Sequence, residues 1–105
     1  MTNHAAALTA LADPTRRAIF ERLARSPSAV GELAHELPVS RPAVSQHLKV
    51  LKSAGLVTDQ AAGTRRVYSV DSSGVAAIRE YFEQFWQQSL ASFRAAASTT
   101  TQEER

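Results

Sequence analysis

The chain has 105 residues, of which 44% are hydrophobic and 21% charged, and a formal net charge of +2, which suits one small domain with a thin core. It contains no cysteine, so disulfides, thiolate metal sites, cysteine redox sensing and cysteine nucleophiles are excluded. No run of about 18 apolar residues suits a membrane span, and the N-terminus lacks the pattern of a secretion signal, so we expect a cytoplasmic protein.

The charge is distributed unevenly along the chain. Residues 14–66 hold nine Lys/Arg and four acidic residues, a local net charge of +5. Residues 67–105 hold three basic and five acidic residues. A basic middle with neutral to acidic ends predicts one surface that binds a polyanion, on a scaffold that does not.

The first part of the chain predicts three short helices. Residues 4–12 are rich in Ala and Leu, and so short a helix needs a partner for stability. Asp13 suits the N-cap and Pro14 the first position of a second helix over about 14–25. A third helix is predicted over 30–37, where a proline follows.

The stretch from Ser40 to Leu56 predicts the helix around which the rest of the chain is organised. The Ser40 hydroxyl can cap the first turn, and Pro42 falls in that turn, where its missing N–H has no cost. Gly55 can adopt the left-handed conformation that ends a helix. Because only two residues separate the cap from the preceding helix, the pair matches a helix-turn-helix unit.

The two faces of this helix differ in chemistry. Val44, Leu48 and Leu51 form a narrow apolar stripe. The other side carries cations, an amide and hydroxyls but no acid: Arg41, Ser45, Gln46, Lys49, Lys52 and Ser53. Such groups contact phosphates and base edges, and a helix fits the major groove of DNA. The alternative is an ordinary surface helix with a solvated polar face, although such helices usually mix both charge signs.

After Gly55 the apolar period changes from 3.6 to 2, which predicts two strands over 56–61 and 65–70, joined by a turn at 62–64. Arg65 and Arg66 follow the tip of this hairpin, where they would reach flanking phosphates or a minor groove. The alternative is that these arginines only keep the hairpin tip soluble. The position of the hairpin directly after the basic helix favours a wing that contacts DNA.

A long final helix is predicted over about 72–97, with Asp71 or Ser72 as its cap. Its apolar positions are Val75, Ile78, Phe82, Phe85, Trp86, Leu90 and Phe93. This aromatic surface exceeds what one helix of a small domain buries, so we expect one side on the core and the other on a second chain. The alternative is that the aromatics complete the core of a single chain. The domain then spans 1–97, and 98–105 is expected to be a disordered polar tail.

The order helix, helix, helix, helix, hairpin, helix predicts a mainly α fold with a small β-hairpin, a winged helix-turn-helix. Three stretches resemble the ArsR-type winged-helix repressors of bacteria: ALADPTRRAIFERLA (10–24), VGELAHELPVSRPAVSQHLKVLKSAGLV (30–57) and GTRRVYSV (63–70). The likeness covers about residues 6–93, and FEQFWQQSL (82–90) resembles a branch of the family without metal sites. The resemblance implies a homodimer that represses transcription by binding double-stranded DNA at an imperfect inverted-repeat operator.

The resemblance also implies pairing through the first and last helices. The residues expected at that dimer interface are Leu8, Leu11, Ile78, Phe82, Phe85, Trp86, Leu90 and Phe93. On the basic helix we expect Arg41, Ser45 and Gln46 to reach base edges. The residues expected to hold phosphates, or to begin the helix beside them, are Ser40, Pro42, Lys49, Lys52, Arg65 and Arg66.

The metal sites of the best-known family members do not match this chain. The Glu-Leu-Cys-x-Cys pattern of their third helix is replaced by Glu32-Leu33-Ala34-His35-Glu36, and the last helix contains no histidine. Glu80 and Glu83 offer only oxygen ligands, a poor set for a transition metal. We expect His4 in a mobile segment, His35 on a solvated face and His47 as a hydrogen-bonded packing residue. The sequence therefore predicts no metal, no other cofactor and no metal response.

No motif supports an enzyme, because the chain lacks a nucleophile elbow, a phosphate-binding glycine loop and a zinc-protease pattern. The alternative from another class is a winged-helix module that binds protein and has lost DNA contact. Such modules usually lose the basic residues that this chain keeps on its helix and hairpin. A small-molecule effector in the aromatic seam near Phe82, Phe85 and Trp86 is a further hypothesis.

Overall fold

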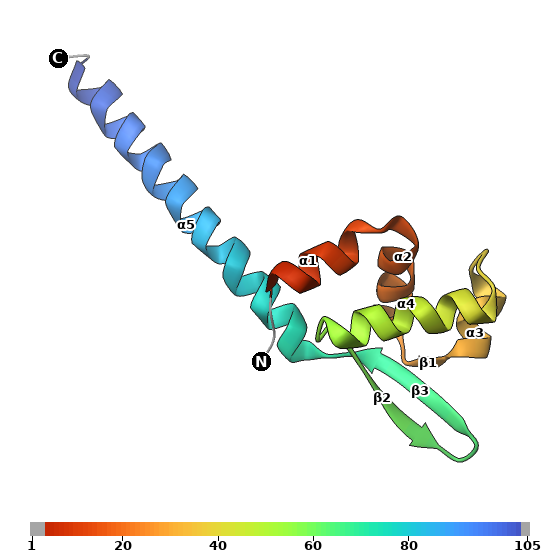
Figure 1. The fold of residues 1–105 in the computed structure, drawn as a ribbon. Helices are drawn as coiled ribbons and strands as arrows, with labels where there is room; N and C mark the ends of the chain where they lie inside the picture. The colour runs from red at the N-terminus through yellow and green to blue at the C-terminus, as the bar shows by residue number, and fades with distance from the viewer. Residues whose placement is uncertain (1–3, 104–105) are drawn as a thin grey trace.

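The computed structural model describes residues 4–103, and Figure 1 shows a compact body from which one long helix projects. The mainly α winged helix-turn-helix with a β-hairpin is confirmed. The elements in chain order are α1 (His4–Ala12), α2 (Pro14–Arg25), β1 (Ser28–Ala29), α3 (Val30–Glu36), α4 (Arg41–Ser53), β2 (Val57–Ala62), β3 (Arg65–Val70) and α5 (Ser72–Glu103).

The predicted helix caps are present. The Asp13 carboxylate accepts the Arg16 amide at 2.8 Å at the start of α2, and the Ser40 hydroxyl accepts the Ala43 amide at 3.3 Å at the start of α4. Gly55 has φ +78° just past the end of α4, where a left-handed residue ends a helix. These local signals therefore determine the residues at which α4 begins and ends.

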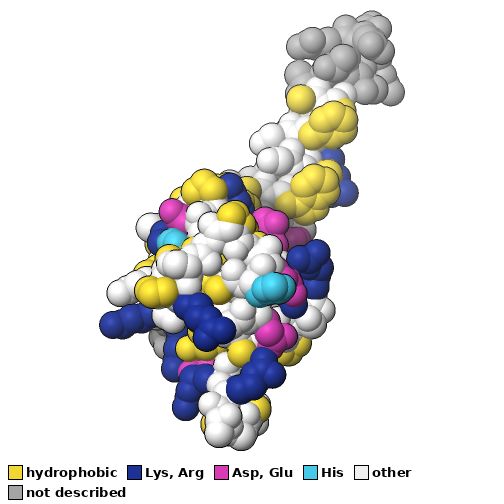
Figure 2. Space-filling view, turned by 90° about the vertical axis from the view of Figure 1, so that its right-hand side faces the viewer, with side chains coloured by type: hydrophobic (Ala, Val, Ile, Leu, Met, Phe, Trp, Pro, Cys, Tyr) yellow, Lys and Arg dark blue, Asp and Glu magenta, His cyan; other side chains and the backbone are white. Residues whose placement is uncertain are grey.

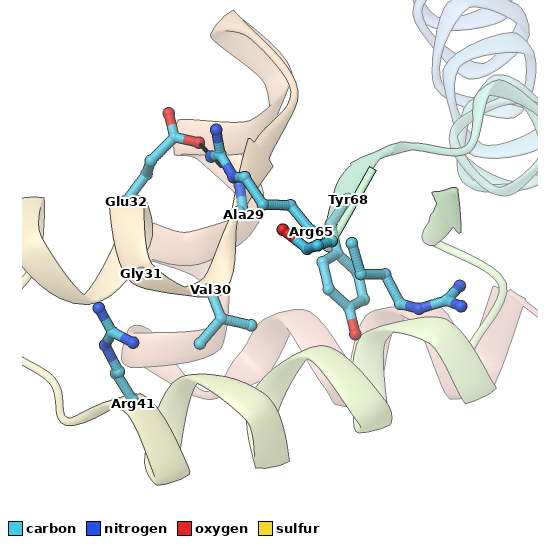
Figure 3. A pocket seen from close by; sticks show the side chains of 9 residues that line it. Ala29, Val30, Gly31, Glu32, Arg41, Arg65 and Tyr68 are labelled. Atoms are coloured by element: carbon cyan, nitrogen blue, oxygen red, sulfur yellow. Dashed lines mark hydrogen bonds and ion pairs between the residues drawn. The ribbon is translucent and has the colours of Figure 1, made fainter. Parts of the chain in front are cut away.

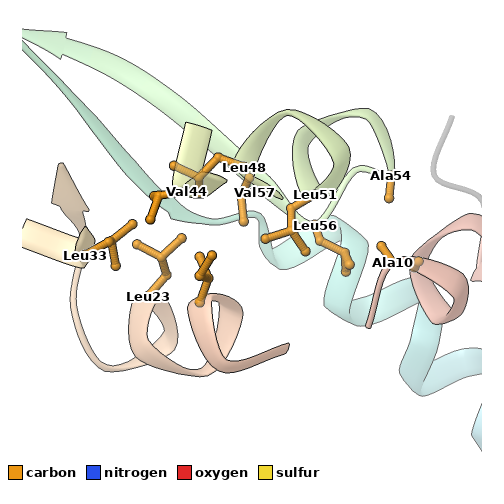
Figure 4. Close-up of a cluster of buried hydrophobic side chains, with 11 residues drawn as sticks. Ala10, Leu23, Leu33, Val44, Leu48, Leu51, Ala54, Leu56 and Val57 are labelled. Carbon is orange, nitrogen blue, oxygen red and sulfur yellow. The ribbon is translucent and has the colours of Figure 1, made fainter. Parts of the chain in front are cut away.

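The core lies between α4 and the helices α1, α2 and α3, and Figure 4 shows the side chains that fill it. The predicted apolar stripe of α4 is fully buried, with Val44, Leu48 and Leu51 each at most 1% exposed. Burial of a Leu side chain stabilises a fold by about 1.5–3 kcal/mol. Because this stripe is held inward, the opposite face of α4 is held toward solvent.

The hairpin joins a third strand that the sequence analysis did not predict. β1 pairs antiparallel with β3, in register Ser28↔Tyr68, so the strand order is β1-β3-β2. Two residues are too few to show a period of 2, and this strand exists through its pairing. β2 begins at Val57 rather than at the predicted residue 56, because the Leu56 amide still donates to the Leu51 carbonyl at the end of α4.

The last helix begins as predicted and ends later than predicted. The Asp71 carboxylate accepts the Ser73 amide at 3.0 Å and so caps α5. The segment from Ser98, expected to be a disordered tail, is helical through Glu103, and residues 104 and 105 lie outside the described range. Neither glycine nor proline interrupts the chain after Gly74, so no residue with a strong helix-breaking preference stops the helix.

Only the first part of α5 packs on the body. The His4 ring stacks on Tyr81, with centroids 4.1 Å apart and an interplanar angle of 15°, so His4 is held in place rather than lying in a mobile segment. Beyond Tyr81 the helix projects away from α1, and hydrophobic side chains are visible along it in Figure 2. Within residues 4–103 no helix is long and apolar enough to cross a membrane.

Candidate nucleic-acid interface

The outer face of α4 and the hairpin form one basic surface. All residues predicted to contact DNA are exposed: Ser40, Arg41, Pro42, Ser45, Gln46, Lys49, Lys52, Arg65 and Arg66. Figure 2 shows Lys and Arg side chains gathered around the hairpin at the bottom of the molecule. Cations, hydroxyls and an amide on an exposed helix beside an arginine-bearing hairpin are the groups that bind phosphates and read base edges.

A hollow of about 670 Å³ joins the start of α4 to the hairpin. Its lining combines Arg41 from α4 with Arg65 and Arg66 from β3, around the first turn of α3 (Figure 3). Ser45, Gln46 and Lys49 lie further along α4 and do not line it. The tertiary structure therefore brings three predicted DNA-binding arginines, from segments far apart in the sequence, around one concave surface.

The small size of Gly31 leaves room for the Arg41 side chain. A Cβ built on Gly31 would lie 3.1 Å from Arg41 Nη2 and 3.4 Å from its Cζ. The guanidinium group therefore lies against the backbone of α3 at the edge of the hollow (Figure 3). This contact holds Arg41 beside the hollow, where its donors can approach the edge of a guanine or a phosphate.

Two acidic residues that the sequence analysis did not assign to the interface pair with its cations. Glu32 of α3 pairs with Arg65, and its Oε1 also accepts the Ala29 amide at 3.3 Å. Asp59 of β2 pairs with Lys52 at 2.7 Å and with Arg66 at 3.0 Å.

One of these contacts has a signal in the strand pairing. Asp59 is opposite Tyr68, and Arg66 is opposite Ala61, so Asp59 and Arg66 are diagonal neighbours on one face of the hairpin, a position that favours opposite charges. The contacts of Lys52 and Glu32 join separate elements and have no such local signal.

The Asp59 carboxylate is held in its charged form. The Lys52 ammonium, which hydrogen-bonds to it, and the Arg66 guanidinium hold the pKa of Asp59 below its ordinary value. Cations within hydrogen-bond distance favour the anion of a carboxyl group. The side chain of Asp59 is only 9% exposed, whereas those of Lys52 and Arg66 are each 56% exposed. The acid thus lies beneath two cations that face solvent.

Several cations counted in the basic middle of the sequence serve the scaffold instead. Arg16 Nε donates to the Ala10 carbonyl at 2.8 Å, and Arg17 donates to Leu11 at 3.4 Å. Arg22 pairs with Glu36, which lowers the pKa of that carboxyl group. Among the described residues, Arg41 and Lys49 take part in no ion pair. These two cations are therefore the ones whose full charge faces solvent on α4.

Among the described residues, His35 and His47 do not belong to a cluster of possible metal ligands. His35 is exposed, as predicted. His47 is half-buried near Asp13, whose pKa is lowered first by the Arg16 amide and further by His47. Among residues 4–103 no three His, Cys, Asp or Glu side chains are grouped so that they could hold a metal ion.

The residues predicted for the dimer interface divide into two sets. Leu11 and Ile78 pack against the core of their own chain, and Leu8 and Leu90 are half-buried. The four aromatic members on α5 are exposed, by 52%, 45%, 61% and 71% for Phe82, Phe85, Trp86 and Phe93. These aromatics do not complete the core of a single chain.

Known proteins match both the sequence and the fold. Residues 11–60 match a family model described as a helix-turn-helix domain. The chain is 66% identical to the HTH-type transcriptional regulator Rv2034 of Mycobacterium tuberculosis, over 80% of this chain and 78% of that protein.

Two solved structures extend the likeness to the fold. An ArsR-like transcriptional regulator from Rhodococcus sp. RHA1 superposes with a TM-score of 0.75 at 31% identity, covering 90% of this chain and 92% of that one. A homodimeric winged helix-turn-helix DNA-binding domain from Mycobacterium bovis, a possible ArsR-family regulator, superposes with a TM-score of 0.65 at 30% identity. That match covers 80% of this chain and 78% of the other.

Proposed function

The chain belongs to the ArsR family of winged helix-turn-helix transcriptional regulators, and from this premise we propose that it is a homodimeric repressor of an inverted-repeat operator. Each protomer would place α4 in a major groove and its hairpin on the flanking backbone. Binding of DNA by this repressor requires no metal. The protein represses by occupying the promoter.

One observation carries this proposal: Arg41, which begins the acid-free outer face of α4, lies with the hairpin residues Arg65 and Arg66 around one hollow. Arg41, at the start of α4, would pair with guanine, and Gln46 would pair with adenine. Lys49, whose charge is unpaired among the described residues, would hold a phosphate. The basic residues that a purely protein-binding module would lose are all present and exposed.

Dimerisation is supported by the exposed aromatics of α5. A contiguous apolar surface on a projecting helix marks a protein interface, and the homologous domain from Mycobacterium bovis is described as homodimeric. In this dimer Phe82, Phe85, Trp86 and Phe93 would contact the partner subunit, together with Leu8, Leu11, Ile78 and Leu90. A small apolar effector would enter the same seam.

Metal-independence is supported by the donor set of α3 and α5. Glu32-Leu33-Ala34-His35-Glu36 contains no thiolate, and α5 offers carboxylates and amides, which suit transition metals poorly. We propose no catalytic activity, because no nucleophile and base occur in a known catalytic motif.

The experiment begins with selection of bound sequences from a random duplex pool, followed by fluorescence anisotropy near physiological salt. The selected duplex is compared with its shuffled version, each with and without excess EDTA. We expect an inverted repeat bound at least about 1,000-fold more tightly than the shuffled duplex, with no effect of EDTA.

Two variants make this experiment specific to the proposed surface. Arg41→Ala should weaken binding to the selected duplex, whereas Arg94→Ala, which removes an exposed arginine from α5, should leave it unchanged. Equal binding to the selected and shuffled duplexes would contradict operator recognition. Loss of binding in EDTA would contradict metal-independence, and the absence of any DNA binding would favour the protein-interaction module.

A further inference from the structure

Asp59 connects the recognition helix to the wing. It lies on β2, and its two carboxylate oxygens contact cations from two other elements, Lys52 of α4 at 2.7 Å and Arg66 of β3 at 3.0 Å. The carboxylate is almost buried, whereas the two cations are more than half exposed. The Asp59 carboxylate therefore holds the Lys52 ammonium of α4 and the Arg66 guanidinium of the wing close to each other.

This arrangement leaves both cations able to bind a phosphate. Lys and Arg each carry more N–H donors than the one that the carboxylate receives. The group of three residues nevertheless has a net charge of +1, because one carboxylate offsets one of the two cations. A count of exposed Lys and Arg thus overstates the charge that this part of the surface presents to DNA.

Resting on the proposed function, we infer that Asp59 is a positioning residue that determines selectivity for the operator over other DNA. It removes one unit of charge from the α4–wing junction, and it ties the wing to the recognition helix. The first effect weakens binding to every sequence. The second effect keeps the wing and α4 in one fixed arrangement, which favours the operator alone.

The reason lies in the different origins of specific and non-specific binding. Binding to non-operator DNA comes almost entirely from phosphate neutralisation and counterion release. Operator binding also includes base contacts from Arg41 and Gln46, whose geometry depends on the placement of the helix and wing. A residue that lowers the positive charge of the surface while it fixes the geometry therefore weakens the affinity for non-operator DNA more than the affinity for the operator.

The test is Asp59→Asn, an isosteric change that adds one unit of positive charge. Affinity for the shuffled duplex is measured by anisotropy over a series of salt concentrations. One additional unit of phosphate neutralisation per protomer should raise that affinity about fivefold for each protomer near physiological salt, about 25-fold for a dimer with both protomers on the duplex, and steepen the salt slope of the dimer by about 1.8. Affinity for the selected duplex should rise less, so the ratio of the two affinities falls.

Two further variants separate charge from structure. Glu80→Gln makes the same change in net charge at an exposed position of α5, away from α4 and the wing, and should leave the salt slope unchanged. The double variant Lys52→Gln with Asp59→Asn restores the charge of +1 without the tie to α4. Its affinity for the shuffled duplex should return to within about twofold of the original, while selectivity stays reduced.

The shuffled-duplex measurements need no operator and test the charge effect of Asp59 alone, whereas the ratio of the two affinities tests its effect on selectivity. A protein without any operator preference would contradict the proposed function, and a clear preference that Asp59→Asn leaves unchanged would overturn this inference alone. Thermal unfolding of each variant establishes that the proteins compared are folded, and Asp59→Ser, which makes the same change in charge, replaces Asp59→Asn if that variant is not folded. Unchanged or weaker binding of Asp59→Asn to the shuffled duplex would overturn the inference. So would an equal gain in affinity from Glu80→Gln.

Discussion

Gly74, in the first turn of α5, lies directly against the backbone of Gly55 at the end of α4. A Cβ built on Gly74 would be 2.1 Å from the Gly55 carbonyl oxygen and 3.1 Å from the Leu56 Cα. The helix that projects from the body therefore begins in contact with the end of the recognition helix. Any side chain at Gly74 would force these two helices apart.

Gly74→Ala should destabilise the fold by about 1–3 kcal/mol, because the obstacle is backbone that cannot rotate away. The matched control is Gly31→Ala, whose new Cβ would meet only the end of the flexible Arg41 side chain, at 3.1 Å. The free energy of unfolding in urea measures both. Equal stability of the Gly74→Ala variant and the original protein would contradict the close contact.

Replacing two neighbouring side chains on the outer face of α4 should weaken DNA binding in two different ways. Gln46→Ala should cost about 1–3 kcal/mol of operator binding per half-site and relax the preference at one base position of each half-site, because a bidentate base contact is lost there. Lys49→Ala should weaken binding to operator and shuffled duplexes alike and reduce the salt slope by about 0.9 per protomer, about 1.8 for the dimer. Anisotropy against single-base operator variants measures both effects. An unchanged base preference in Gln46→Ala would remove that residue from base recognition.

Trp86 is 61% exposed on the projecting part of α5, so its replacement tests the dimer without disturbing the core. Trp86→Ser should shift the protein toward monomer in sedimentation velocity and weaken operator binding, because two half-sites are no longer bound as one unit. The thermal midpoint of the monomeric body should change little. The exposed polar residue Gln84 provides the control, as Gln84→Ser should leave the dimer intact. A variant that remains fully dimeric would place the interface elsewhere.

The hydrogen-bonded carboxylate of Asp71 should make the folded protein less stable in acid. Its carboxylate accepts hydrogen bonds from the Ser73 hydroxyl at 2.7 Å and the Ser73 amide at 3.0 Å, which lower its pKa from the ordinary 3.8. Because the folded pKa lies below the unfolded one, this contribution is complete above about pH 4 and is lost as the pH falls through the folded pKa.

Urea unfolding between neutral pH and about pH 3 measures this effect. The free energy of unfolding should fall over the acid end of the range, and it should fall less steeply in Asp71→Asn, which has no carboxyl group to titrate. Asn remains a good cap, so α5 should persist in the variant. The same acid dependence in both proteins would mean that Asp71 contributes nothing to it.

The sequence by itself determined the elements that local chemistry encodes. Ser40 and Asp13 mark helix starts, and Gly55 marks a helix end, because capping depends on a few neighbouring residues. The stripe of Val44, Leu48 and Leu51 determined which face of α4 is buried, since the helical period sets that face. The family resemblance rested on these same stretches and was confirmed by the relatives.

Only the tertiary structure decided how the charges are paired and how the last helix is placed. Glu32 and Arg65 are 33 residues apart, and no periodicity relates them. Asp59 lies in reach of Lys52 because the wing folds back along α4. The start of α5 is likewise placed by contacts between elements, Gly74 against Gly55 and Tyr81 against His4. Such pairings depend on distances between elements, which local patterns do not contain, and they set the charge and geometry that the DNA-binding surface presents.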